Sequence, residues 1–280
     1  MSWASASFVS ARPLKVIPVP LFSFLRFTLV GVVFLAISVL LSGFSNFARS
    51  EVGLLIASGV IGIAFGETLL YKAIKEIGVQ KGLIAFSLNI PITALLSVSL
   101  GERAASISLL LGAAMATTAV ILAVLVRTKD ATEPELQPSR VGYAAGLGAA
   151  VGQSIGLILT KAAVSEAHSI FAVSSIRALS AAAVMICIVL TARSAFTLST
   201  LQDKAVARDT ILSTILSSGL GLFFANMALQ HGDAAVVASS LSLSPVFAIL
   251  FGAVGARKMP DRQIFASLVC LAVGLYLLSR

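Results

Sequence analysis

One acidic residue lies well inside an apolar stretch of this 280-residue chain. Glu67, in the sequence IAFGETLLY, falls about two-thirds of the way along a helix predicted over residues 53 to 76. Desolvation favours the protonated form of a carboxyl group, and charges inside hydrocarbon are costly and usually functional. We therefore predict that Glu67 carries a proton or binds a cation. A structural ion pair with Arg26 or Lys72, or a side chain that reaches the membrane interface, is the alternative.

Two arginines, Arg26 and Arg177, occupy matching places in two other apolar stretches. Each lies about 10 Å into its helix, at about 1.5 Å per residue. A guanidinium group can reach lipid headgroups from that depth along its own aliphatic stem, which is the simpler interpretation. Contact with an anionic group of a substrate is the functional alternative, and both residues are candidates for it.

Uncharged polar residues outline the wall of a candidate solute cavity. In one predicted helix, Asn89, Thr93 and Ser97 recur every four residues, which places them on one face beside the kink expected at Pro91. A proline frees a backbone carbonyl, and such carbonyls are tolerated in a membrane only where they are packed or face water. This face is therefore predicted to line a cavity and not to face lipid.

The second half of the chain repeats this arrangement around Pro245, where Ser240 and Ser244 lie close by. The predicted substrate or proton pathway is completed by Tyr71, Gln153 and Asn226. Plain hydrogen bonding between helices is the alternative for each of these residues.

Neither a metal site nor a cofactor is predicted. His168 and His231 are isolated at the edges of loops, where a solvated surface histidine is the expected role. Cys187 and Cys270 lie in apolar stretches without a Cys-x-x-Cys pairing, so they indicate neither a disulfide framework nor a thiolate metal site.

The composition indicates an integral membrane protein. Hydrophobic residues make up 58% of the chain and charged residues 11%, and the mean hydropathy is +1.01. Soluble domains carry about 25% charged residues. The apolar stretches are long enough for helices that cross a bilayer, which need about 20 residues each, whereas the strands of membrane barrels are much shorter.

The chain is also a duplication. Gly78, Pro91 and Arg103 have counterparts exactly 154 residues later, at Gly232, Pro245 and Arg257. Arg26 in SFLRFTLVG corresponds likewise to Arg177 in SSIRALSAA. Each half holds about five apolar segments, and because five is odd the second half must enter the bilayer from the opposite side. We therefore predict an all-α fold of about ten transmembrane helices in two inverted five-helix repeats, the architecture of many secondary transporters.

The predicted repeats cover residues 1–126 and 141–280, with a polar linker over 127–140. Full helices are expected at 20–42, 53–76, 79–100, 105–126, 141–164, 169–192, 209–230, 233–255 and 261–279. The first helix of the first repeat is expected to be truncated, since MSWASASFVSA matches only the end of the corresponding helix in the second half. Either the start of the sequence is misplaced or this helix is short.

The basic residues lie almost entirely on one side of the predicted helices. Fourteen fall in the loops between helices 1 and 2, 3 and 4, 5 and 6, 7 and 8, and 9 and 10, whereas Arg49, Arg103, Lys161 and Arg280 fall on the other side. The positive-inside rule then makes the 127–140 linker cytoplasmic and the C-terminus external. This asymmetry explains the net charge of +8 better than nucleic-acid binding, for which a basic cluster interleaved with exposed aromatic residues is missing.

Two segments resemble a known family. GETLLYKAIKEIGVQKGLIAFSLNIPITALLSVSLGER and FFANMALQHGDAAVVASSLSLSPVFAILFGAVGAR are similar to the helix 3 to helix 5 core of EamA-type proteins in the drug/metabolite transporter superfamily. The resemblance implies ten helices in two repeats, a central substrate cavity, and export or exchange of small metabolites. Two features depart from the family pattern. The second repeat has Ala256 where the first repeat has Glu102, and the C-terminus is predicted to be external.

The sequence therefore favours a multi-pass secondary transporter in the inner cell membrane, which moves amino acids, amines or similar metabolites and is not an enzyme. Its expected partners are a small-molecule substrate and the lipid bilayer. The sequence does not decide whether the protein forms a homodimer. The alternatives are a channel, a non-transporting scaffold or an intramembrane enzyme. The enzyme is disfavoured because clustered acids or histidines for metal chemistry are missing from the sequence.

Overall fold

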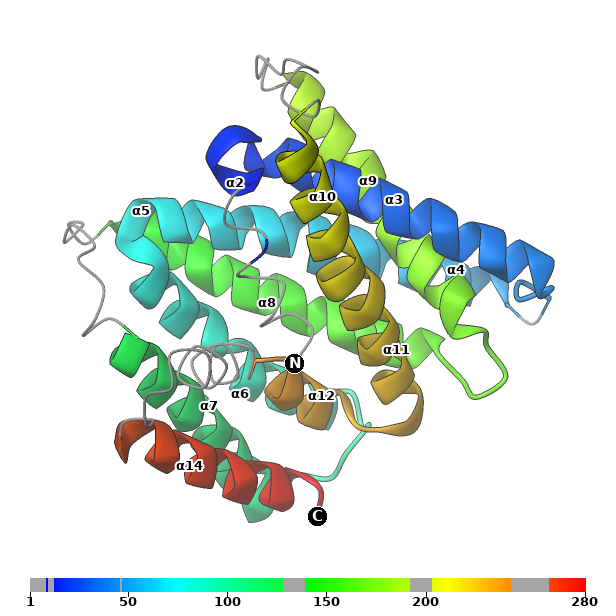
Figure 1. The fold of residues 1–280 in the computed structure, drawn as a ribbon. Helices are drawn as coiled ribbons and strands as arrows, with labels where there is room; N and C mark the ends of the chain where they lie inside the picture. The colour runs from blue at the N-terminus through cyan, green and yellow to red at the C-terminus, as the bar shows by residue number, and fades with distance from the viewer. Residues whose placement is uncertain (1–8, 10–12, 46, 128–138, 192–202, 243–261) are drawn as a thin grey trace. The chain divides into compact units, whose positions relative to one another are not determined.

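The computed structural model describes residues 9, 13–45, 47–127, 139–191, 203–242 and 262–280, and within them the regular structure is helical throughout (Figure 1). Six described helices are long and apolar enough to cross a membrane, and two shorter apolar helices cover Ile107–Ala123 and Phe265–Leu278. The chain is thus an all-helical, multi-pass membrane protein.

The helices, in chain order, are α2 (Pro13–Val16), α3 (Val19–Leu40), α4 (Arg49–Ser58), η1 (Gly59–Phe65), α5 (Gly66–Ser87), α6 (Asn89–Ser99), α7 (Ile107–Arg127), α8 (Arg140–Ala163), α9 (Ile170–Thr191), α10 (Lys204–Ser213), η3 (Thr214–Gly221), α11 (Leu222–His231), α12 (Ala234–Leu241) and α14 (Arg262–Leu278). Eight of the expected spans coincide with these helices. The span expected at 233–255 is described only as far as Ser242, and the first helix, which the sequence predicts to be truncated, lies mostly outside the described residues.

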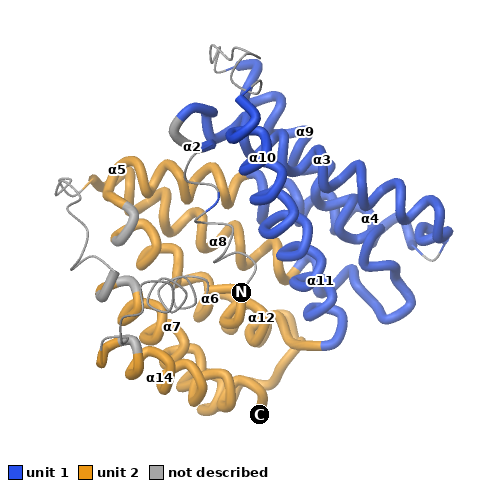
Figure 2. The backbone as a smooth tube through the Cα atoms, in the orientation of Figure 1, with its two compact units in different colours: residues 1–64, 159–231 blue, residues 65–158, 232–280 orange. Residues whose placement is uncertain are grey.

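The chain forms two compact units, coloured separately in Figure 2. Unit 1 comprises residues 1–64 and 159–231, and unit 2 comprises residues 65–158 and 232–280. Each unit therefore contains helices from both predicted sequence repeats.

In unit 1, α3 and α9 pack along their lengths in opposite directions. A Cβ atom built on Gly31 would lie 2.7 Å from the side chain of Leu179, and the rings of Phe34 and Phe171 lie 5.6 Å apart. From Gly31 to Phe34 the residue numbers rise along α3, whereas those of their partners on α9 fall from Leu179 to Phe171, so the two helices are antiparallel. Both helices have 22 residues, and they are each other's counterparts in the sequence repeat.

In unit 2, α7 and α14 pack in the same antiparallel way. A Cβ atom on Gly112 would lie 2.8 Å from Leu278, and the Ser267 hydroxyl donates a 2.6 Å hydrogen bond to the Ala119 carbonyl. These helices are also counterparts in the sequence repeat. Each unit thus contains a pair of repeat-related helices that run in opposite directions.

Two π-helical segments recur at equivalent points of the repeats. η1 begins at Gly59, ten residues after the start of α4, and η3 begins at Thr214, ten residues after the start of α10. Each joins its neighbouring helices into one apolar span, Arg49–Gly78 or Lys204–His231. The sequence did not predict these segments, and π-helical turns are frequently found at functional sites.

Both spans begin earlier than expected, because polar residues cap them. The Glu51 carboxylate accepts a 2.7 Å hydrogen bond from the Ala48 amide, and the Asp203 carboxylate accepts a 2.8 Å hydrogen bond from the Ala205 amide. Each cap satisfies a backbone donor that a helix start leaves open. The helices predicted from residues 53 and 209 therefore start at Arg49 and Lys204.

The regular helical structure is interrupted shortly before Pro91. α5 ends at Ser87 and α6 begins at Asn89, four and two residues before this proline, because its ring excludes a helical hydrogen bond to residue 87. A bend lies within α5 at Gly78, whose φ of 84° is in the left-handed region that favours glycine. The bend at Gly78 therefore lies where the sequence separated the span 53–76 from the span 79–100.

Candidate functional site

The Arg26 side chain is buried in unit 1 and bonded to the π-helical segment η3. Its Nη2 donates hydrogen bonds to the hydroxyls of Ser217 (2.7 Å) and Ser218 (2.9 Å). Its guanidinium carbon lies 5.1 Å from the centre of the Phe22 ring and 5.7 Å from that of Phe27, distances at which cation–π attraction operates. The group is thus held by two hydroxyls and two aromatic rings.

This placement does not agree with an interfacial role for Arg26. Ser217 and Ser218 are the two central residues of the 28-residue span Lys204–His231. The guanidinium therefore points toward the middle of the span, whereas a snorkelling arginine would extend toward the nearer helix end.

Arg177, the counterpart of Arg26 in the repeat, is 4% exposed and also contacts the Lys204–His231 span. Its Nη1 donates to the Asn226 side-chain oxygen. The Asn226 amide nitrogen in turn donates to the Ser174 hydroxyl at 2.8 Å. Asn226 was predicted as a pathway residue and Arg177 as a candidate anion contact, and the structure brings them into direct contact.

The predicted polar face of α6 is completely buried in unit 2. Asn89 donates from its amide nitrogen to the Phe86 carbonyl at 2.7 Å and to the Ser242 hydroxyl at 3.2 Å. The Thr93 hydroxyl (2.6 Å) and the Ser154 hydroxyl (3.0 Å) both donate to the Asn89 carbonyl. These bonds satisfy the backbone carbonyls of Phe86 and Asn89 shortly before Pro91. Part of this face therefore serves hydrogen bonding between helices, which was the alternative to a cavity wall.

The other predicted pathway residues lie at different points of unit 2. Glu67 and Tyr71 are half-buried on α5, and Gln153 is half-buried on α8. Glu67 is the second residue after η1 ends. Ser244 and Pro245 lie outside the described residues.

The sequence missed the serines that hold these groups. They are Ser174, Ser217 and Ser218 in unit 1, and Ser154 and Ser242 in unit 2. A usable signal existed for the α10 to α11 span, where Thr210, Ser213, Thr214, Ser217 and Ser218 form a polar stripe in an otherwise apolar helix. All five are buried.

The prediction for His168 was wrong, whereas that for His231 is confirmed. The His231 side chain is 60% exposed, but His168 is buried and stacks on the Phe47 ring with 4.2 Å between centres. Its Nδ1 accepts a 3.1 Å hydrogen bond from the Ser165 amide, and its Nε2 lies 3.3 Å from a Glu51 carboxylate oxygen. Two loops far apart in sequence fold together around this ring, which the sequence of either loop does not indicate.

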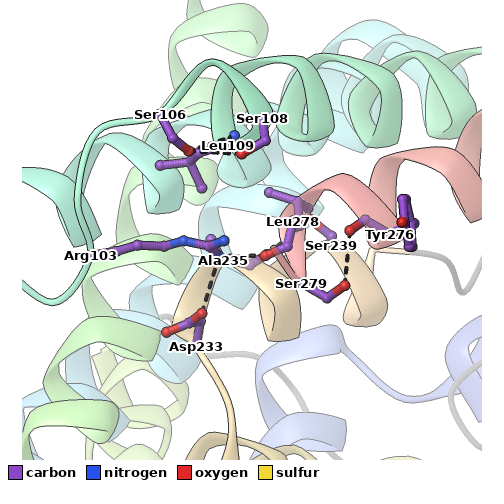
Figure 3. Close-up of polar contacts among 10 residues, drawn as sticks. All are labelled: Arg103, Ser106, Ser108, Leu109, Asp233, Ala235, Ser239, Tyr276, Leu278 and Ser279. Atoms are coloured by element: carbon purple, nitrogen blue, oxygen red, sulfur yellow. Dashed lines mark hydrogen bonds and ion pairs between the residues drawn. The ribbon is translucent and has the colours of Figure 1, made fainter.

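An ion pair ties together one end of unit 2. Arg103 Nη1 lies 3.1 Å from Asp233 and also donates to the Leu278 carbonyl, between the two groups in Figure 3. The charge count assigns the loop of Arg103, the loop of Asp233 and the C-terminus to the same side of the membrane. Their direct contact agrees with that assignment.

Comparisons with known proteins identify the fold and the family. One solved structure, titled only "Crystal structure of protein", superposes with a TM-score of 0.77 at 17% sequence identity, and the match covers 99% of this chain and 93% of that chain. At this identity the likeness shows the fold alone. No curated protein matches the chain.

The sequence pattern of the EamA-like transporter family matches twice, over residues 1–125 and 140–280. These two matches coincide closely with the two repeats expected from the sequence, and together they cover nearly the whole chain. The chain therefore belongs to the EamA-like transporter family of membrane proteins.

Proposed function

We propose that this protein is a secondary transporter of the inner cell membrane that exports or exchanges small metabolites by alternating access. The observation that carries the proposal is the antiparallel packing of repeat-related helices, α3 with α9 in unit 1 and α7 with α14 in unit 2. A two-fold axis in the membrane plane reverses the direction of every helix that it relates, so these pairs are what two inverted repeats would produce. Inverted repeats of this kind underlie alternating access in many transporter folds.

The same observation supports ten helices in two five-helix repeats. The eight described spans and the described start of the ninth follow the repeat order. In this arrangement the first helix of the first repeat is the counterpart of α8.

Glu67 is proposed to couple transport to protons. It is the second residue after η1 and lies eleven residues before the end of the 30-residue span Arg49–Gly78, which corresponds to about 16 Å at 1.5 Å per residue. Its counterpart in the second repeat, 154 residues later, is the uncharged Gly221 at the end of η3. A carboxyl group present in one repeat alone gives the two halves different chemistry, which a directional cycle requires.

Transport is tested by counterflow in proteoliposomes. Vesicles loaded with an unlabelled amino acid or amine should accumulate the labelled solute transiently and saturably, because exchange through an alternating site couples the two fluxes. Non-saturable flux would indicate a channel, and chemical conversion of the solute would indicate an enzyme. If neither flux nor conversion were observed, the protein would be a scaffold. Each of these results would contradict the proposal.

The coupling role is tested with Glu67→Gln, which removes the titration and nearly preserves the shape. The variant should insert normally and keep downhill exchange, but lose accumulation driven by a pH gradient. Glu166→Gln is the matched control, because the Glu166 side chain is 82% exposed, and it should behave as the wild type. An unchanged pH profile in Glu67→Gln would show that its carboxylate is structural.

A further inference from the structure

The guanidinium group of Arg177 is buried and has no carboxylate partner among the described residues. Only 4% of the residue is exposed. In the described part of the chain its hydrogen-bond partner is the neutral Asn226, which Nη1 contacts, and its Nε atom is shielded from solvent and has no partner. By contrast, the described arginines that form ion pairs, Arg103 and Arg208, each pair with an aspartate.

This arrangement is energetically expensive. A guanidinium group stays charged in proteins and presents five N–H donors. Burying an ion without a counter-charge costs several kcal/mol, and one amide oxygen satisfies only one donor. A buried charge that is maintained at such a cost is expected to have an anionic partner at some stage of the protein's function.

The remaining edge of the guanidinium indicates what that partner is. Nη1 is engaged by Asn226 and Nε has no partner among the described residues, and the fork formed by Nε and Nη2 matches the two oxygens of a carboxylate or phosphate. The hydroxyl of Ser174 accepts from Asn226 at 2.8 Å and keeps its own proton to donate. The three side chains together present donors for a single oxyanion.

The contact with Asn226 places the guanidinium group within a membrane span. Asn226 lies five residues before the end of the Lys204–His231 span, about 8 Å inside it at 1.5 Å per residue. It also lies eight residues, or about 12 Å, beyond Ser218, where Arg26 binds. Both repeat-related arginines therefore reach the same membrane span from within unit 1.

We propose that Arg177, with Asn226 and Ser174, binds the anionic oxygen group of the transported solute, a carboxylate or a phosphate. This inference rests on the proposed transport function and gives it a substrate class. Because Nε is shielded from solvent here, binding requires a rearrangement that exposes it.

The test has a readout without ligand and a readout with ligand, both on the full chain purified in detergent. Arg177→Gln removes the charge but keeps a side-chain N–H donor, so its Tm should equal or exceed that of the wild type, since the desolvation cost of a buried ion without a counter-charge is removed with the charge. The control Arg103→Gln breaks an ion pair and should melt lower. A lower Tm for Arg177→Gln would show that the guanidinium serves structure, and would overturn the inference.

The ligand readout uses the protein amino acids, their decarboxylated amines, succinate and inorganic phosphate as probes of thermal stability. At least one anionic probe should raise the Tm of the wild type and of Arg103→Gln, while the amine with the same carbon skeleton should not. Affinity should fall roughly tenfold or more in Arg177→Gln, as expected for the loss of a charge-assisted hydrogen bond, and partly in Arg177→Lys, which keeps the charge but loses the fork. Stabilisation by amines alone, or by no probe, would overturn the inference.

Failure of the site and failure of the transport function are distinguishable. Saturable counterflow of an amine that is unchanged in Arg177→Gln would refute the anion site and leave transport intact. Arg177-dependent binding of an anion without any counterflow would refute transport instead, and the proposal that this anion is its substrate would fall with it.

Discussion

Replacing Gly59 with alanine should separate α4 and η1 from α9 in unit 1. A Cβ atom at Gly59 would meet the Ser180 hydroxyl and the carbonyl oxygen of Arg177, and would lie 3.0 Å from the Arg177 Cα. Two of these three atoms belong to the backbone of α9, so a change of side-chain rotamer cannot make room for the methyl group. The helices must move apart, and Arg177 must move with them.

The expected cost follows from two opposing terms. Overpacking of a tight contact costs about 1–3 kcal/mol, and the upper end applies because backbone atoms obstruct the methyl group. Alanine recovers about 1 kcal/mol of helix propensity over glycine, which leaves a net destabilisation of about 2 kcal/mol. Gly53, six residues earlier on the same span, has no atom within 4 Å of its built Cβ, so Gly53→Ala should stabilise by about 0.5–1 kcal/mol.

The assay is reversible unfolding in mixed micelles with increasing SDS, followed by the helical circular-dichroism signal. The two alanine variants should differ by about 3 kcal/mol in free energy of unfolding, in opposite directions from the wild type. Ser180→Ala in the Gly59→Ala background should recover only part of the loss, since the Arg177 backbone still blocks the methyl group. Equal stability of Gly59→Ala and Gly53→Ala would refute the close packing of these helices.

The remaining predictions concern unit 2 and the C-terminus. In a double-mutant cycle of Arg103→Gln and Asp233→Asn, the coupling energy should be about 0.5–1 kcal/mol and should fall with salt, since Asp233 is 43% exposed; no coupling would contradict the ion pair. Gly274→Ala should destabilise by about 1–3 kcal/mol, because its Cβ would lie 2.9 Å from the Ala116 amide nitrogen, and an unchanged unfolding curve would refute that contact. A fluorescent reporter after Arg280 should stay dark if the C-terminus is external, and a bright fusion would show that the charge count was misleading.

The repeat made much of the helical order predictable. α3 and α9 were located by the correspondence of Arg26 with Arg177, and the observed helices differ from the expected ranges by two residues or fewer at each end. The error was larger at α4 and α10, where capping carboxylates extend the helices past the apolar stretch. Hydropathy alone cannot find such starts, because the first helical turn outside the apolar stretch is polar.

The polar contacts were less predictable for a different reason. Arginine is conspicuous in an apolar helix, whereas serine is common there and often bonds to its own backbone, as Ser213 does with the Thr210 carbonyl. Which serines face an arginine depends on helix rotation, and π-helical turns change that rotation without altering hydropathy. The sequence thus marks Arg26 and Arg177 as unusual, but it does not show which residues they contact.

The position of η3 explains how two adjacent serines can serve one arginine. Consecutive side chains on an α-helix diverge by about 100°, which makes it difficult for Ser217 and Ser218 to reach a common donor. A π-helical turn closes its hydrogen bonds between residues five apart, so it holds more residues per turn and brings consecutive side chains closer in direction. Because η3 contains both serines and ends at Gly221, the same turn also sets the rotation of α11 and therefore the direction of Asn226. One local irregularity thus positions the hydrogen-bond partners of both buried arginines. At the equivalent point of the first repeat, η1 precedes Glu67. Each charged residue that we propose to act in transport therefore depends on a π-helical turn for its position or for that of its partner.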